Sequence, residues 1–312
     1  MHVGYLLTRA AQRYAERAAW LEGDIMIAFR EAERGVNRLA RALLSLGGQP
    51  GDRVAMLLPN CYQGLETLLA PMKAGMAVVP MNVRLHPSEH EYMLNDSGAF
   101  ALVYGAEFRA HLGQIRGNLT SIKHFICVGL GASGDLGYEE LLDGHEDTPP
   151  EPAIDPDDLA WIFCTSGTTG HPKGAMLTHR NLITLAEQFL LDINPVEPGD
   201  VLLHAAPITH GSRLSIFHHI ARGAASAFPP TRSFDPPRIF EAIQRYQATT
   251  MFLAPTMVHM LVTSPDKANY DLSSLHTIFY GGGPMYVEQL VDAVCAFGSI
   301  RELRDRYWAG RA

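Results

Sequence analysis

Apolar residues follow two spacings along this chain. Where they recur every three or four positions they predict helices that bury one face, and where they form short unbroken runs they predict strands buried on both faces. The helical spacing predicts helices over residues 3–18, 32–46, 62–73, 108–115, 178–191, 237–244 and 256–262. The apolar runs predict strands over residues 26–29, 53–58, 76–79, 100–104, 124–128, 159–164, 175–177, 200–206, 249–253 and 277–280. Because helices and strands alternate, the pattern predicts an α/β fold with parallel strands.

One long stretch follows neither spacing. Residues 143–158 contain four prolines and seven acidic residues. Proline interrupts both helices and sheets, and clustered charges favour solvent, so the stretch is predicted to be an exposed connector. A cluster of acidic metal ligands is the alternative interpretation, but a solvated linker is favoured.

Two histidines lie one helical turn apart near a predicted helix start. His86 and His90 flank Pro87, which suits the first position of a helix. Histidines at this spacing can share a metal ion, but no third ligand is evident. They are therefore predicted to be surface histidines.

The strand predicted over residues 159–164 leads into the stretch with the most distinctive chemistry. Its sequence is Thr165-Ser166-Gly167-Thr168-Thr169-Gly170-His171-Pro172-Lys173-Gly174. Glycines let backbone N–H groups approach a ligand, hydroxyls donate hydrogen bonds, and the lysine supplies a positive charge. A plain hairpin turn is the alternative, but it needs neither this length nor the lysine. The stretch is therefore predicted to bind phosphate.

The spacing excludes the loop of P-loop nucleotide triphosphatases. That pattern requires a glycine where Pro172 stands and Ser or Thr where Gly174 stands. A kinase or NTPase of that class is thus disfavoured.

The ten residues resemble the signature loop of the adenylate-forming superfamily, which includes acyl- and aryl-CoA synthetases, luciferases and peptide-synthetase adenylation domains. Thr178-His179-Arg180-Asn181-Leu182 continues the likeness to acyl-CoA synthetases, and residues 72–82 resemble the segment that packs the first subdomain of the family. The resemblance implies the large N-terminal domain of the acyl-CoA synthetase-like fold.

Two further segments follow predicted strands, where ligands bind in α/β sheets. In residues 207–212 the resemblance implies that His210 lines the substrate carboxylate and gates the acyl site. No aspartate occurs from 207 to 217, which disfavours amino-acid substrates. Gly281, Gly282, Gly283 and Pro284 form the other segment, whose glycines allow a flat ring to approach the backbone. A tight turn is the alternative, and the resemblance favours a position along adenine.

The resemblance also implies the chemistry. A carboxylate, most plausibly of a fatty acid, would react with ATP to give an acyl-adenylate, which coenzyme A would convert to a thioester. Thr165, Ser166, Gly167, Thr168, Thr169, Gly170, Lys173 and Gly174 would hold the triphosphate. Lys173 and His210 would be the catalytic residues present, and Thr165 would supply one ligand to Mg²⁺.

Composition and charge limit the partners and the cellular compartment that we expect for this chain. The formal charge of −8 and pI near 5.9 argue against a nucleic-acid surface. Four distant cysteines without a C-x-x-C pair, no signal-peptide pattern and no apolar run long enough to span a bilayer predict a cytoplasmic protein. Peripheral membrane association is left open.

The likeness covers residues 1–299. The family then has a strand and a Tyr-Gly-x-Thr-Glu motif whose glutamate completes the magnesium site, whereas residues 300–312 carry four arginines and lack the motif. We therefore expect an incomplete N-terminal domain over 1–299, a non-family arginine-rich tail over 300–312 and no C-terminal lid domain. The alternative function is accordingly a catalytically incompetent fragment that retains at most nucleotide or acyl binding. An incomplete sheet would also lower solubility.

Overall fold

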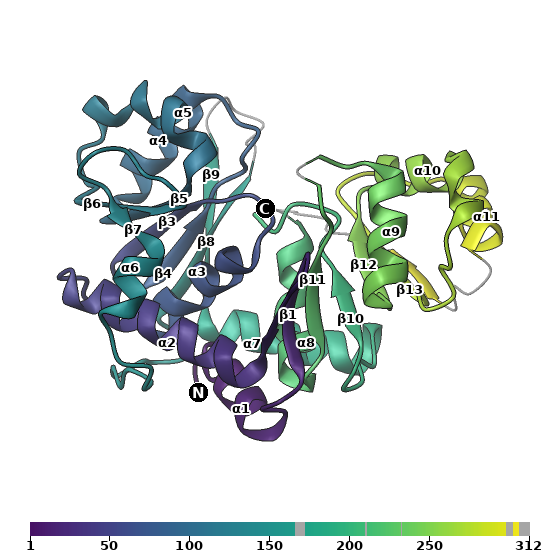
Figure 1. Cartoon of the computed structure of the whole chain (residues 1–312), viewed down its shortest axis with the longest axis horizontal. Coiled ribbons are helices and arrows are strands. Elements are labelled where there is room, and N and C mark those ends of the chain that lie inside the picture. Colours follow the sequence, from purple (N-terminus) through teal and green to yellow (C-terminus); the bar gives the residue numbers. More distant parts are fainter. Residues whose placement is uncertain (166–171, 210, 232, 298–301, 306–312) are drawn as a thin grey trace. The chain divides into compact units, whose positions relative to one another are not determined.

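The computed structural model describes residues 1–165, 172–209, 211–231, 233–297 and 302–305. The chain divides into two compact units. The first comprises residues 1–12 and 30–185, and the second comprises residues 13–29 and the chain from 186 onward. Within the described residues each unit contains a seven-stranded sheet in which most strands are parallel (Figure 1). The predicted α/β fold with parallel strands is confirmed.

The sheet of the first unit has the strand order β7-β6-β5-β3-β4-β8-β9. All neighbouring strands are parallel except β8 and β9, which form an antiparallel hairpin. The strands are β3 (Arg53–Leu57), β4 (Ala77–Pro80), β5 (Ala101–Gly105), β6 (His124–Val128), β7 (Leu136–Gly137), β8 (Leu159–Thr165) and β9 (Lys173–Thr178). The helices are α1 (Tyr5–Arg13), α2 (Phe29–Ser45), α3 (Tyr62–Lys73), α4 (Pro87–Ser97), α5 (Arg109–Gly113), α6 (Tyr138–Asp143) and the start of α7 (His179–Gln188).

The sheet of the second unit has the order β14-β13-β12-β10-β11-β1-β2, and only β1 and β2 are antiparallel. Its strands are β1 (Ala18–Glu22), β2 (Ile25–Ala28), β10 (Val201–Leu203), β11 (Ala225–Phe228), β12 (Thr250–Leu253), β13 (Thr277–Tyr280) and β14 (Glu302–Asp305). Its helices are α8 (Ile216–Arg222), α9 (Pro236–Tyr246), α10 (Pro255–Thr263) and α11 (Val287–Phe297), and a π-helical turn spans Phe189–Ile193.

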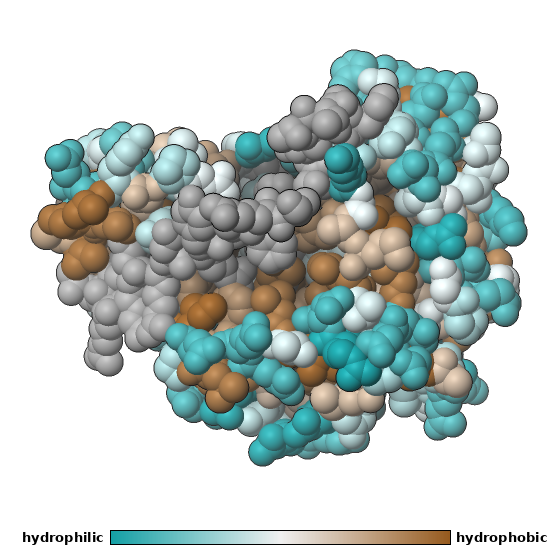
Figure 2. Space-filling view, turned by 180° about the vertical axis from the view of Figure 1, so that it is seen from behind, coloured by the Kyte–Doolittle hydropathy of each residue, from teal (hydrophilic) through white to brown (hydrophobic). Residues whose placement is uncertain are grey.

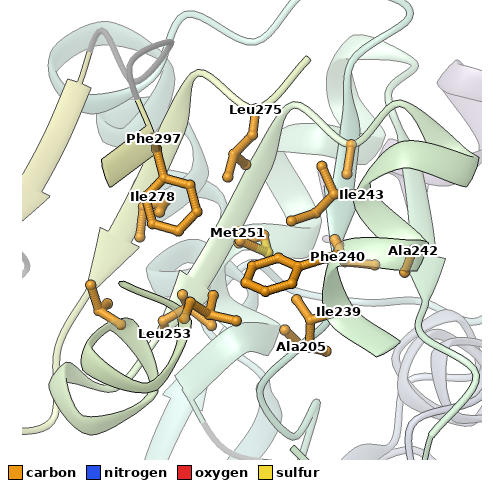
Figure 3. Packing of buried hydrophobic residues seen from close by; sticks show 14 of the residues in the cluster. Ala205, Ile239, Phe240, Ala242, Ile243, Met251, Leu253, Leu275, Ile278 and Phe297 are labelled. Atoms are coloured by element: carbon orange, nitrogen blue, oxygen red, sulfur yellow. The ribbon is translucent and has the colours of Figure 1, made fainter. Parts of the chain in front are cut away.

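One face of the second sheet carries a continuous apolar core. Phe240 and Ile243 of α9 pack with Met251 of β12 and Ile278 of β13, all of them fully buried (Figure 3). Alternate residues of a strand point to opposite faces, so residues 202, 204, 226 and 228 belong to the other face.

The chain begins differently from the prediction. A single helix was expected over residues 3–18, but α1 ends at Arg13 and Ala18 begins strand β1. This strand pairs in parallel with β11, so that Trp20 lies opposite Ser226. A partner about two hundred residues away leaves no trace in local periodicity, which is why the strand was missed.

The predicted tail also contains regular structure. Residues 300–312 were expected to lie outside the family fold, but β14 extends the sheet, with Thr277 opposite Glu302 and Tyr280 opposite Asp305. Charged residues occupy three of its four positions. An apolar run therefore does not mark this strand.

The prediction for His90 is wrong. Its side chain is fully buried, and its Nε2–H donates to the carbonyl oxygen of Asn82 at 2.9 Å. Since a carbonyl only accepts, His90 Nδ1 is the acceptor in the 2.7 Å hydrogen bond with His111 Nε2. Burial lowers the pKa of His90 to about 4. It is a neutral core residue, whereas His86 caps α4.

Helix α2 binds the proline- and acid-rich connector. Arg41 Nε donates to the carbonyl of Thr148 at 2.6 Å, and Asn37 Nδ2 donates to the carbonyl of Asp147 at 2.8 Å. Residues 144–158 form no helix or strand. Side chains of α2 thus supply the hydrogen bonds that regular structure would otherwise provide.

Polar side chains are also buried between α2 and α3. Lys73 Nζ donates to Glu33 Oε1 at 2.5 Å and to Asn37 Oδ1 at 2.7 Å. Glu66, two helical turns before Lys73 on α3, accepts a 2.7 Å hydrogen bond from the Tyr138 hydroxyl. Burial raises the pKa of Glu66 to about 7, and the charge of Glu139 adds to this effect. Lys73 has a direct counter-ion, whereas Glu66 has a neutral hydroxyl donor.

Helix α11 exposes apolar side chains at helical spacing. Val287, Val291 and Val294 are exposed along it, next to exposed Tyr286. Figure 2 shows one face of the molecule, on which hydrophobic patches interrupt the hydrophilic surface. Apolar surface of this kind favours association or aggregation.

The Glu66 environment predicts a pH-dependent stability. In the unfolded chain Glu66 has its ordinary pKa of 4.5, so the fold binds its proton more tightly, and stability is lost as pH rises from about 4.5 to 7. Glu66→Gln keeps an acceptor for Tyr138 without the charge. We expect it to raise the free energy of unfolding by about 3 kcal/mol at pH 8 and to change it little at pH 4.5.

Denaturant unfolding at both pH values measures this difference. Glu140→Gln is the control, because it removes the same charge from an exposed position two residues from Tyr138. An equal gain for Glu66→Gln at both pH values would contradict the assignment.

Candidate functional site

The β8–β9 hairpin carries the predicted phosphate-binding loop. Its register places Thr165 opposite Lys173 and Cys164 opposite Gly174. The first and ninth residues of the loop sequence are therefore neighbours at the base of the loop, where β8 ends and β9 begins. Ser166, Gly167, Thr168, Thr169 and Gly170 lie outside the described residues.

Gly174 is required by packing within the hairpin. A Cβ atom at this position would lie 2.5 Å from Cγ2 of Ile162 on the opposite strand. The side chain of isoleucine is branched at Cβ and cannot turn this methyl aside easily. Gly174 therefore allows β9 to pair closely with β8.

Lys173 begins β9 with an exposed side chain. Its ammonium group is a compact charge on a flexible stem, which suits a phosphate whose position changes during a reaction. The role of Lys173 in binding phosphate stays a prediction.

The residues after the hairpin cap helix α7, as the sequence predicted. Thr178 Oγ1 accepts from the backbone N–H of Asn181 at 3.2 Å, and Asn181 Oδ1 accepts from the backbone N–H of Thr178 at 3.0 Å. This reciprocal pair satisfies backbone donors at the helix start. It also fixes the direction in which the chain leaves β9.

The other members of this motif connect α7 to distant parts of the unit. Nδ1 of buried His179 accepts from the backbone N–H of Val3 at 3.3 Å. Arg180 makes two hydrogen bonds, of 2.6 and 2.9 Å, to the carboxylate of Asp157 in the connector. Leu182 is fully buried. Residues 178–182, which resemble the family in sequence, thus anchor the chain that follows the β8–β9 hairpin to the rest of the first unit.

In the second unit, a predicted site segment follows β10. His204 comes directly after the strand and is fully buried. Its ring stacks on Phe228, with centroids 5.2 Å apart, and its Nδ1 shares a 2.9 Å hydrogen bond with Ser212 Oγ. Burial, together with the charge that His219 would carry, lowers the pKa of His204 to about 3. His210 itself lies outside the described residues.

Two further buried histidines follow on α8. The ring of His218 stacks on Phe189 at 4.7 Å, and the ring of His219 is 4.5 Å from that of His218. His219 Nδ1–H donates to the carbonyl of Ser215 at 2.7 Å. Sequence analysis missed His204, His218 and His219. The adjacent histidine pair, directly after Ile216 and Phe217, was the available signal.

The glycine segment follows β13. Gly281 N–H donates to the carbonyl of Leu253 at 3.2 Å, which continues the ladder between β12 and β13 by one residue. Gly282 has φ +84°, a conformation that favours glycine. Gly283 is exposed, and a Cβ there would be 3.8 Å from its nearest neighbour, an ordinary contact with Pro255.

The parallel register relates these two segments. Strand β12 pairs with both β10 and β13, and all three run in the same direction. The segments that follow β10 and β13 therefore emerge at the same edge of one sheet, where α/β proteins bind ligands.

The described residues contain no group of three or more His, Cys, Asp or Glu side chains placed to hold a metal ion. The role of Thr165 as a magnesium ligand stays a prediction. Across the same residues, no helix is long and apolar enough to cross a membrane.

The profile of the AMP-binding enzyme family matches residues 7–309. The chain belongs to this family. The match extends beyond residue 299, where the sequence alone suggested that the likeness ends, and it includes β14.

Relatives within the family differ in their named substrates. The chain is 34% identical to a feruloyl-CoA synthase of an Amycolatopsis species over 89% of this chain and 53% of that protein. It is 31% identical to a long-chain-fatty-acid–CoA ligase of Escherichia coli O157:H7 over 92% of this chain and 56% of that protein. The chain thus spans about half the length of these relatives.

A solved structure confirms the expected domain. The inhibitor-bound N-terminal domain of FACL13 from Mycobacterium tuberculosis superposes with a TM-score of 0.87 and 26% identity, over 98% of this chain and 75% of that one. We predicted that the chain corresponds to part of the large N-terminal domain of this family. The coverage of 75% of the FACL13 domain agrees with that prediction.

The contact at Gly174 predicts the effect of a substitution. Gly174→Ala would force the hairpin strands apart, and we expect a loss of about 1–3 kcal/mol of stability. Hydrogen exchange at the amides of β8 and β9, together with thermal unfolding, measures this effect. Ala175→Ser changes the next, exposed residue of β9 and should leave exchange unchanged. Similar behaviour of the two variants would refute the packing role of Gly174.

Proposed function

We propose that this chain forms the nucleotide- and carboxylate-binding part of an ATP-dependent acid–CoA ligase. The observation that carries the proposal is the β8–β9 hairpin, which places Lys173 opposite Thr165 at the base of a loop made of glycine and hydroxyl residues. A loop of this composition neutralises phosphate, and family membership supports the same chemistry.

The proposed reaction has two steps. A carboxylate oxygen of the acid attacks the α-phosphorus of ATP, the bond from that phosphorus to its bridging oxygen breaks, and pyrophosphate leaves. The thiolate of coenzyme A then attacks the acyl carbonyl, and AMP leaves with the electron pair of the acyl–oxygen bond. In both steps negative charge builds up on a phosphate oxygen of the leaving group, which is pyrophosphate in the first step and AMP in the second. Positive charge and N–H donors near these oxygens therefore lower the barrier.

The residues of this chain would act mainly in the first step. Lys173 would balance charge on the departing pyrophosphate, and the loop hydroxyls would orient the triphosphate. Mg²⁺ would add further charge neutralisation when bound with ATP. The edge formed by the ends of β10 and β13 would hold the acid and the adenine ring.

Gly283 supports the placement of a flat ring at that edge. The conformation of Gly282 accounts for glycine at position 282, but within the described residues neither backbone conformation nor packing requires glycine at position 283. A ligand that lies against the backbone would account for the missing side chain.

We propose a fatty acid as the first candidate substrate and an aryl acid as the second. Support for the first comes from the ligases for long-chain fatty acids among the relatives, and support for the second from the 34% identity to a feruloyl-CoA synthase. Amino acids are disfavoured because no aspartate occurs from 207 to 217.

ATP–pyrophosphate exchange with a panel of acids tests the proposal. The panel includes fatty acids of graded length, ferulate and benzoate, and exchange with one class identifies the substrate class. Magnesium-dependent ATP binding by calorimetry without exchange would support the alternative of an incompetent fragment. Release of ADP in place of AMP would refute the ligase chemistry.

Gly283→Ala separates ligand binding from folding. Because the added methyl meets only an ordinary contact at 3.8 Å, we expect the melting temperature to stay the same. Affinity for ATP should fall at least about tenfold, which corresponds to about 1.4 kcal/mol of lost contact. Gly282→Ala is the contrasting variant, since its positive φ should lower stability first. Unchanged ATP affinity of a folded Gly283→Ala protein would remove this residue from the site.

A further inference from the structure

The turn after β10 is closed by a buried hydrogen bond. His204 ends the strand and Ser212 lies in the 3₁₀ turn Gly211–Ser215, eight residues later. Their side chains are fully buried, and Nδ1 of His204 is 2.9 Å from Oγ of Ser212. The bond therefore joins the two ends of the segment 205–211.

Both ends of this bond are held by neighbouring structure. The backbone N–H of His204 donates to the carbonyl of Ala227 at 2.9 Å, and its ring stacks on Phe228 of the same strand. On the other side, His219 Nδ1–H donates to the carbonyl of Ser215, which fixes the start of α8 to the 3₁₀ turn. The anchors thus belong to strand β11 and helix α8.

The apolar surroundings of the hydrogen bond between His204 and Ser212 make its loss costly. Phe228, Ile216 and Phe217 are all fully buried in this part of the unit. A buried hydroxyl or imidazole nitrogen that loses its partner costs roughly 1–3 kcal/mol, so the pair favours one arrangement of the turn over others. An apolar pair of similar size would fill the space without selecting that arrangement.

We propose that His204 and Ser212 are positioning residues that hold the backbone of residues 205–209 in the geometry that binds the carboxylate. The proposal rests on the proposed function, because the segment is assigned to the acid through family resemblance. Neither side chain reaches solvent. They act on the substrate through the backbone between them.

Because Nδ1 of His204 makes the hydrogen bond to Ser212, substitutions that keep or lose a polar atom at this position test the bond. Asparagine places a polar atom near the position of Nδ1, and glutamine places it near Nε2. His204→Asn should therefore keep the bond to Ser212, whereas His204→Gln, His204→Leu and Ser212→Ala should lose it. The double variant His204→Leu/Ser212→Ala tests coupling, because two partners of one bond are not lost additively.

Two measurements are made on the full chain. Hydrogen exchange at the amides of residues 205, 206, 208 and 209 should be about tenfold faster in His204→Leu and Ser212→Ala, which corresponds to the loss of one buried bond. ATP–pyrophosphate exchange should show the KM for the acid raised about tenfold with the KM for ATP unchanged. His204→Asn should stay within about threefold of the native protein in both.

Several outcomes would overturn the inference. These are unchanged hydrogen exchange in the segment, equal increases in both KM values, or equal behaviour of the asparagine and glutamine variants. Failure of the proposed function looks different, because the native chain would then show no exchange with any acid. Faster hydrogen exchange in the variants of such an inactive chain would leave the bond as a structural contact and refute its positioning role.

Discussion

The backbone ladder through β10, β12 and β13 decides where the second unit can bind a ligand. Each strand is only three or four residues long, and all of them run in the same direction. Their carboxyl ends must therefore meet at one edge, whatever the side chains are. The segments after β10 and β13 are separated by about seventy residues in the sequence, and the ladder alone brings them to that edge. In the first unit, the antiparallel pairing of β8 and β9 places Thr165 and Lys173 opposite each other.

Buried polar side chains show where the sequence departs from simple hydrophobic packing. Lys73 has the carboxylate of Glu33 as its counter-ion, and His90 has hydrogen bonds at both ring nitrogens. Glu66 is different, because only a neutral tyrosine hydroxyl faces its carboxylate and burial raises its pKa. A buried group that stays ionised needs a charged partner, whereas a neutral imidazole needs only hydrogen bonds. This difference explains how His204, His218 and His219 can be buried next to aromatic rings.

The sequence was enough to predict elements that are amphipathic or that are followed closely by a glycine. Helix α3 and strands β6 and β13 begin and end at the predicted residues, since Gly75, Gly129 and Gly281 follow them closely. Helix α8 was missed because residues 216–220 are all buried, which erases the helical alternation. Strands β1 and β14 were missed because their stability comes from partners far away in the chain. In the candidate site, composition was enough to find the loop and the glycine segment, but the His204–Ser212 contact depends on a turn whose shape no local pattern encodes.

Three glycines in the predicted site segments show that glycine can be required at different positions for different reasons. Gly174 is needed because Ile162 occupies the space of a Cβ atom, and Gly282 because its backbone has φ +84°. A sequence pattern cannot separate these reasons, since each position appears in the sequence only as a glycine in or next to a strand. Among these three, only Gly283 has neither a backbone conformation nor a contact with the described residues that requires glycine. A position that folding leaves free and that still lacks a side chain is best explained by something outside the chain, and at this edge of the sheet a ligand is the simplest such cause.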